Sequence, residues 1–160
     1  MTTLNTALVA NSLASPQILN DAAELHGVLR VAAGTAELAA GDSTDNDVVL
    51  LAPIPSKASI SSIKVGSDGL GGSCTFNVGV HNYDGTVADE DCFSTAVADA
   101  GAMTDVRNEV ATINTTGQKL WEIAGLSSDP GGLLYMSITF AATGGTAGTL
   151  SWNISYAVNS

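Results

Sequence analysis

The feature that most constrains the fold is a strict alternation of apolar and polar side chains near the end of the sequence. Residues 134–140 and 150–158 both read apolar, polar, apolar along their length. A period of two is typical of β-strands with one face in a core and the other in water. Antiparallel sheets show this pattern, whereas strands of buried parallel sheets read as unbroken apolar runs. The sequence therefore predicts an all-β fold, an antiparallel jelly-roll-like β-sandwich, in which we expect these two strands to pair as a hairpin.

Further strands are predicted over shorter stretches, namely residues 28–33, 35–39, 48–52, 59–65, 74–80 and 119–124. Gly34 lies between the first two and indicates a bend or a bulge. Residues 48–52 are continuously apolar, which indicates a strand buried on both faces. In the stretch 59–65, Ile60 and Ile63 fall out of phase. A β-bulge would bring both to the core, or Ile60 could belong to a strand end.

One segment changes period. Phe93, Ala96, Val97 and Ala100 recur at the spacing of one helical face, and the acidic residues 89–91 precede them. Asp89 can cap a helix, and acidic side chains in a first turn are favoured by the helix dipole. We therefore expect one short inserted helix near residues 89–100. For residues 103–118, a turn of helix near Val106 and an irregular loop remain alternatives.

The chain has the length of one domain, but its first part differs from the rest. Residues 1–26 show no sustained period, and Pro16 would break a helix. We expect residues 1–26 to form an extended N-terminal arm that packs on another molecule, with a frayed terminus as the alternative. Residues 27–160 should form a single β-sandwich domain.

The net charge of −11 limits the partners, because sixteen acidic residues face five basic ones. Nucleic-acid binding needs a basic stripe that displaces phosphate counterions, and the five basic residues are scattered singly. An anionic membrane would repel this surface too. We therefore expect neither nucleic acid nor membrane as a partner. The acidity suits solubility or a basic protein surface. The start of the sequence has no basic region followed by an apolar core, so we expect no signal peptide.

No catalytic constellation is evident. His26 and His81 are the two histidines, both are expected in solvent at strand ends, and no G-x-S-x-G or P-loop motif occurs. Paired carboxylates could hydrolyse glycosides, but sugar sites also need exposed aromatic rings. We expect Trp121, Trp152 and Tyr156 in the core instead. The sequence predicts no enzyme, no catalytic residue and no cofactor.

Metal sites are not predicted either, although one loop leaves the question of calcium open. Asp42, Asp45 and Asp47 are spaced like the start of a calcium loop, but its glycine and its final glutamate are missing. Cys74 and Cys92 do not form a C-x-x-C motif, and we expect reduced thiols. A disulfide would require the helix carrying Cys92 to lie across the end of the strand carrying Cys74.

Several strings of residues, in this order and spacing, resemble a family of small structural proteins encoded beside the capsid genes of tailed bacteriophages. The strings occupy residues 27–31, 34–38, 53–58, 63–65, 78–80, 84–85, 89–93, 120–126 and 148–151, with a late Tyr156. The likeness extends from about residue 26 to the end of the sequence. It does not supply catalytic residues.

The resemblance implies a capsid decoration or cement protein on the outer surface of the virion, assembled in the host cytoplasm. Its implied partners are the major capsid protein and further copies of itself, as dimers or trimers. The arm would then supply the capsid or subunit contact through its apolar side chains, which are Leu4, Leu8, Val9, Leu13, Ile18 and Leu19.

Two other classes of protein share such compositions. A carbohydrate- or receptor-binding module of a phage tail, neck or head fibre would show an exposed aromatic platform. A lyase or hydrolase domain would gather its carboxylates in one cleft. The sequence does not separate a head location from a neck or tail location.

Overall fold

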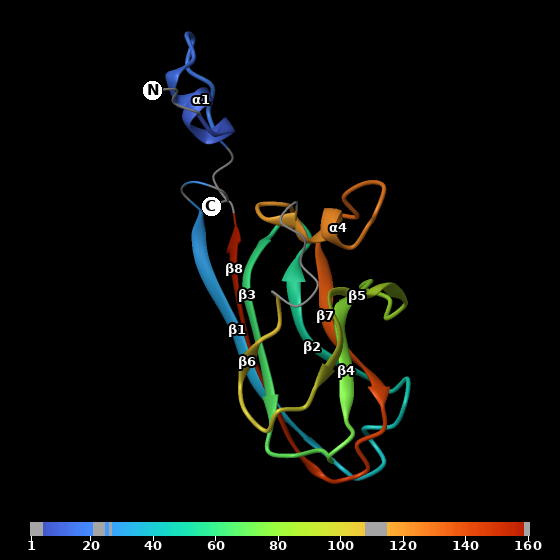
Figure 1. Ribbon diagram of the computed structural model, residues 1–160. Coiled ribbons are helices and arrows are strands. Elements are labelled where there is room, and N and C mark those ends of the chain that lie inside the picture. Colours follow the sequence, from blue (N-terminus) through green and yellow to red (C-terminus); the bar gives the residue numbers. More distant parts are fainter. Residues whose placement is uncertain (1–4, 21–24, 26, 108–114, 159–160) are drawn as a thin grey trace.

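The computed structural model describes residues 5–20, 25, 27–107 and 115–158. In this part of the chain eight strands form two antiparallel sheets that pack face to face (Figure 1). Sheet A has the order β1 (Val28–Leu38), β8 (Gly148–Val158), β3 (Ser59–Ser67) and β6 (Thr104–Asp105). Sheet B has the order β2 (Val48–Pro55), β7 (Leu133–Ala142), β4 (Thr75–His81) and β5 (Val87–Ala98). This arrangement is a jelly roll, and the predicted all-β sandwich is confirmed.

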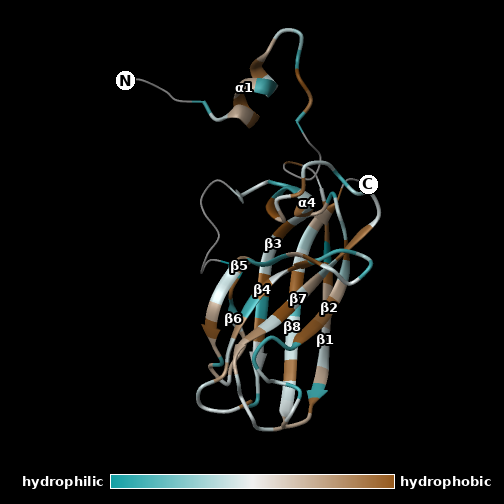
Figure 2. Cartoon of the chain, turned by 90° about the vertical axis from the view of Figure 1, so that its right-hand side faces the viewer, coloured by the Kyte–Doolittle hydropathy of each residue, from teal (hydrophilic) through white to brown (hydrophobic). Residues whose placement is uncertain are grey.

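The core lies between the two sheets. Its largest fully buried side chains are Phe76, Phe93, Phe140, Ile54, Ile63, Leu70, Leu120, Leu134, Met136, Ile138, Leu150 and Ile154. Most of them belong to strands in which every second side chain points inward, as the alternation predicts. Figure 2 shows the result as brown segments that alternate with paler ones along the strands.

The predicted bulge in the third strand is present. The register of β3 against β8 shifts between Ile60 and Ser62. The extra residue brings both Ile60 and Ile63 to the core, at 4% and 0% exposure. Of the two alternatives that the sequence left open for Ile60, the bulge is the one that forms.

The helix expected near residues 89–100 is wrong, because this segment is strand β5. β5 has twelve residues against seven in β4, and its register against β4 shifts three times. These shifts bring Phe93 and Val97 to the core, so an irregular strand mimics a helical spacing. The side chain of Asn77 also accepts a hydrogen bond from the Ala96 backbone N–H, at 2.8 Å.

The strand expected over residues 119–124 is wrong too. These residues contain the short helix α4 (Leu120–Ile123). The carboxylate of Glu122 accepts a hydrogen bond from the Lys119 N–H at 2.8 Å, which satisfies a backbone donor at the start of the helix. Leu120 and Ile123 are both buried, so one turn of helix closes the end of the core.

The hairpin expected between the last two strands does not form. β7 pairs with β2 and β4 in sheet B, whereas β8 pairs with β1 and β3 in sheet A. Residues 143–147 thus cross from one sheet to the other. Of residues 103–118, residues 104–105 form β6, Val106 is buried, and residues 108–114 lie outside the described part.

Two smaller expectations also change. Gly34 causes neither a bend nor a bulge, since the register of β1 against β8 runs through it without a shift. It leaves room for the facing indole, because an added Cβ would lie 2.7 Å from Trp152. Residues 48–52 are not buried on both faces, because the side chains of Val48 and Leu50 are exposed.

Candidate interaction surface

The first segment of the chain is not fully extended. Residues 7–13 form helix α1 (Ala7–Leu13), and none of its residues is buried. Figure 1 shows α1 apart from the sandwich, beyond the end at which β1 begins and β8 finishes. The apolar side chains of this helix are therefore not part of the core.

Residues 5–20 fold back on themselves through polar contacts. The amide of Asn11 donates to the side-chain oxygen of Asn20 at 2.8 Å. Asn20 in turn donates to the carbonyl of Leu8 at 3.0 Å, and the Ile18 N–H donates to the carbonyl of Asn11 at 3.1 Å. The segment is thus a compact knob whose polar groups bond to one another.

The apolar side chains of the knob point outward. Among the described residues, the exposed large apolar side chains concentrate in one part of the chain: Val9, Leu13, Ile18, Leu19, Leu25, Val28, Leu29 and Val31. Leu13 is 69% and Leu19 89% exposed. Single exposed apolar residues are ordinary, but such a concentration indicates an interaction site.

The six predicted contact residues meet different outcomes. Val9, Leu13, Ile18 and Leu19 are exposed, Leu8 is half-buried, and Leu4 lies outside the described residues. No residue from 5 to 20 is charged, although the protein has a net charge of −11. The knob can therefore approach another protein without bringing its own charge with it.

The exposed side chains of β1 were not predicted as a surface. Leu29 and Val31 lie on the outer face of sheet A, at 63% and 57% exposure, while Ala32, Gly34 and Ala36 occupy the inner positions. Both faces of β1 are apolar in the sequence, so alternation alone does not tell which one is inside. The small size of the inner residues was the one feature of the sequence that could have shown which face of β1 packs against the core.

In the acidic loop that resembles a calcium site, two carboxylates bond to the backbone of the loop itself. Asp42 accepts a hydrogen bond from the Ala39 N–H, and Asp47 accepts one from the Thr44 N–H, both at 2.9 Å. The Thr44 hydroxyl also bonds to Asp47, and these contacts lower the pKa of Asp47. The carboxylates therefore stabilise the turn. Within the described residues, no three His, Cys, Asp or Glu side chains are grouped to hold a metal ion.

His81 is buried, not solvated as expected. Its Nδ1 lies 2.8 Å from the hydroxyl oxygen of Ser137, and the two residues are 3% and 0% exposed. A substrate cannot reach a hydroxyl that is fully enclosed, so this pair is a packing contact between β4 and β7. Burial lowers the pKa of His81, and the nearby Glu90 carboxylate partly opposes this shift.

This burial predicts a loss of stability in acid. The unfolded chain protonates this imidazole near pH 6.5, while the folded chain protonates it only at lower pH, so the unfolded state gains protons first. The free energy of unfolding should fall below about pH 6.5, by at most about 1.4 kcal/mol per pH unit for this one group. Urea unfolding of wild type and His81→Gln at pH 7.5 and 5.5 measures it. Equal losses in both proteins would contradict the prediction.

The cysteines and aromatic residues are also placed. Cys74 is buried, Cys92 is half-buried, and both are free thiols whose pKa is raised by burial. Trp121, Trp152 and Tyr156 are half-buried against the core. Tyr83 is 69% exposed and stacks on Tyr135 with ring centres 5.8 Å apart, which the sequence did not reveal.

No helix in the described part of the chain has the length and apolar character needed to cross a bilayer.

Comparison with known proteins gives a likeness of fold. No family model matches the chain, and a search of curated proteins finds no match. A chain of the structure called "Cyanophage Pam1 capsid asymmetric unit" aligns with 99% of this chain and 100% of its own, with a TM-score of 0.57 and 18% identity. A chain of the "Acidic stable capsid structure of Helicobacter pylori bacteriophage KHP30" aligns with 85% of this chain and 92% of its own, with a TM-score of 0.44 and 15% identity. The first of these shows a shared fold over nearly the whole length.

Proposed function

We propose that this chain is a structural protein of a bacteriophage capsid. The observation that carries the proposal is the likeness in fold to a chain of the cyanophage Pam1 capsid asymmetric unit, which takes in nearly all of both chains. The ordered strings of residues that resemble small phage structural proteins point the same way. The buried His81 and Ser137, and the carboxylates that bond within their own turns, favour a protein without catalysis.

We further propose that it decorates the outside of the head and binds the major capsid protein. The acidic surface favours this side of the shell, because packaged DNA would repel it. A decoration protein strengthens a capsid by burying surface across the joints between capsomers. Many copies act together, so a modest affinity at each site is sufficient.

The knob is the proposed contact with the capsid. Specific attachment needs about 800 Å² from each partner, roughly a tenth of the 8412 Å² of surface on this chain. Leu13, Ile18 and Leu19 offer apolar surface on a backbone that its own hydrogen bonds already hold in shape. Such preorganisation lowers the entropy lost on binding. In this proposal residues 1–26 serve attachment and residues 27–160 form the domain that is attached.

Removal of residues 1–20 should leave a folded sandwich that no longer binds capsids. The reason is that residues 5–20 add nothing to the core, since none of them is buried. Particles lacking the protein are mixed with wild type or with the deleted chain, and occupancy is measured by sedimentation and by electron microscopy of the heads. A finer variant replaces Leu13, Ile18 and Leu19 with serine.

The matched control replaces three exposed apolar residues of the sandwich, Tyr83, Val87 and Met103, with serine. It should bind as wild type does. Wild-type occupancy by the deleted chain would refute the role of the knob, and failure of wild type to bind any head would refute the decoration role.

The exposed Tyr83 ring keeps one alternative open, a carbohydrate- or receptor-binding module of a phage tail, neck or head fibre. Aromatic faces are common platforms for sugar rings, and Tyr83 is held by its stack on Tyr135. Calorimetry with host-surface glycans, compared between wild type and Tyr83→Ala, distinguishes the two functions. Glycan binding that is lost with the ring would favour the alternative.

A further inference from the structure

One side of the sandwich consists of two free strand edges. β1 is the outer strand of sheet A and β2 is the outer strand of sheet B, and the two lie next to each other across the sandwich. Within the described residues, β1 pairs with β8 alone and β2 with β7 alone. We call this side, formed by residues 28–38 and 48–55, the open side. Its unpaired N–H and C=O groups can accept a further strand.

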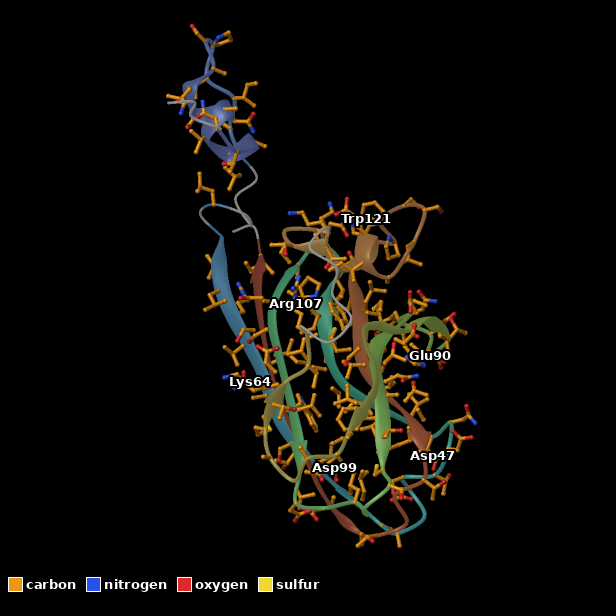
Figure 3. The ribbon with its side chains drawn as sticks, viewed as in Figure 1. Asp47, Lys64, Glu90, Asp99, Arg107 and Trp121 are labelled. Carbon is orange, nitrogen blue, oxygen red and sulfur yellow. The ribbon has the colours of Figure 1, made fainter. Side chains whose placement is uncertain are left out.

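The two ends of the open side carry opposite charge. At the end where β1 begins, Arg30 and Lys57 line a hollow of about 320 Å³ together with Pro55 and Val158. At the other end, a hollow of about 360 Å³ is lined by Asp42 and Asp47. Figure 3 shows Asp47 at the end of the sandwich opposite to α4. Along the strand direction, the open side is therefore positively charged at one end and negatively charged at the other.

Arg30 is the cation available to a partner. The ammonium group of Lys57 lies 3.5 Å from the Asp129 carboxylate, whereas Arg30 makes no ion pair within the described part of the chain. The opposite charge lies at the other end of the open side, on Asp42 and Asp47. A partner that complements this surface must carry a positive and a negative end in reverse order.

We propose that two copies of this chain pair through their open sides, with β1 of one copy antiparallel to β1 of the other. The two-fold axis is perpendicular to the sheets, so sheet A of one copy continues into sheet A of its partner. This axis places Arg30 of each copy beside the acidic end of the other. A two-fold axis along the strands would instead bring like charges together.

The strands favour β1 over β2 as the main contact. Pro53 and Pro55 remove two N–H donors from β2, which is typical of an edge strand protected from pairing. β1 contains no proline, and its 11 residues span roughly 35 Å. Its outward side chains Leu29 and Val31 are 63% and 57% exposed and would lie beside side chains of the partner's β1 on the outer face of the joined sheet.

The pairing also meets the problem of charge. Two copies with a net charge of −11 each repel one another. A stable contact between them must therefore be nearly neutral and must contain ion pairs between the copies. The open side meets both conditions, with one free cation and a nearby acidic turn in each copy. This inference does not rest on the proposed capsid role, because it concerns the free protein.

Light scattering after gel filtration, with sedimentation equilibrium for the dissociation constant, tests the pairing. Wild type should have about twice the mass of the 16.1 kDa chain. Arg30→Asp and Asp42→Arg should each raise the dissociation constant about tenfold or more, since each change acts twice in a symmetric dimer. The combined variant should return to within about threefold of wild type, because the two substituted residues again place opposite charges across each contact.

Matched controls separate this contact from general effects of charge. Lys64→Asp and Asp91→Arg make the same changes of charge on β3 and β5, away from the open side, and should leave the dimer intact. Val31→Lys should give a monomer. Val87→Lys should not, although Val87 is 55% exposed and Val31 is 57% exposed. Circular dichroism melting confirms that each variant is folded.

A wild-type monomer at every concentration would overturn the proposal. So would a dimer that persists in folded Arg30→Asp and Val31→Lys, since the contact would then lie elsewhere. Single charge variants that weaken the dimer, without recovery in the combined variant, would overturn the antiparallel arrangement. Binding of the protein to heads does not enter any of these outcomes.

Discussion

Replacing Gly79 with alanine should lower the free energy of unfolding by about 3 kcal/mol. Gly79 lies in β4, where β5 passes so close that an added Cβ would be 2.2 Å from the carbonyl oxygen of Asp89 and 2.2 Å from the carbonyl carbon of Glu90. Both neighbours are backbone, so neither can rotate away as a side chain does. The only relief is a shift of the irregular part of β5 away from sheet B.

Urea unfolding followed by circular dichroism measures this effect. Gly72→Ala is the control, because Gly72 is exposed and an added Cβ there meets nothing within 4 Å. Its unfolding midpoint should match that of wild type. If Gly79→Ala has the same midpoint as Gly72→Ala, then β5 does not pass as closely over β4 as the structure describes.

Replacing Phe140 with alanine should cost about 3–5 kcal/mol. Phe140 lies in β7, is fully buried, and faces Phe76 across the pair of strands β4 and β7. Removing the ring leaves a void in the core against sheet B that the neighbouring strands cannot fill. The backbone of Phe140 also bonds to that of Asn46 and Asp47, so collapse of β7 into the void would strain the acidic turn.

The same urea titration separates loss of volume from loss of the aromatic ring. Phe140→Leu keeps most of the volume and should cost less than about 1.5 kcal/mol. A cost for Phe140→Ala no larger than that for Phe140→Leu would show that sheet B closes over the missing ring, contrary to the rigid packing expected of this core.

The alternation of side chains determines the class of the fold but not its connections. It correctly predicts the inward faces of β3 and β4, including the bulge near Ile60, because these depend on residues close together in the sequence. It does not determine which strands become neighbours. β7 and β8 follow each other with a short connection, yet they belong to different sheets, because each finds better partners far away in the chain.

Local patterns failed where long-range contacts decide the conformation. β5 has helical spacing in the sequence, but the edge of β4 supplies hydrogen bonds, and shifts of register bring Phe93 and Val97 inward. α4 read as a strand because its apolar residues alternate. The signal of a helix start was Glu122, three residues after Lys119, whose backbone N–H bonds to the Glu122 carboxylate. An argument from periodicity alone does not consider such a capping residue.

The candidate surface was predicted in part. Leu13, Ile18 and Leu19 attract notice in the sequence because apolar residues without a period have no place in a core, and they are exposed. Alternation places Leu29 and Val31 together on one face of their strand. It does not tell that this face is exposed, since the small residues on the opposite face give little contrast in hydropathy. The burial of His81 depends on Ser137, which is 56 residues away, and could not be read from either segment alone.

The pairing of Val28 with Val158 means that the polypeptide enters and leaves the jelly roll at one and the same end. The loops that hold Gly41 and Gly72 are exposed at the other end, where an extra atom on either glycine has open space around it. Exposed loop tips of this kind tolerate added sequence best. A peptide tag or antigen grafted at Gly72 would therefore be carried on the far side of the molecule from the knob, away from the proposed capsid contact. Gly41 suits this use less well, because it lines the acidic hollow of the proposed dimer contact.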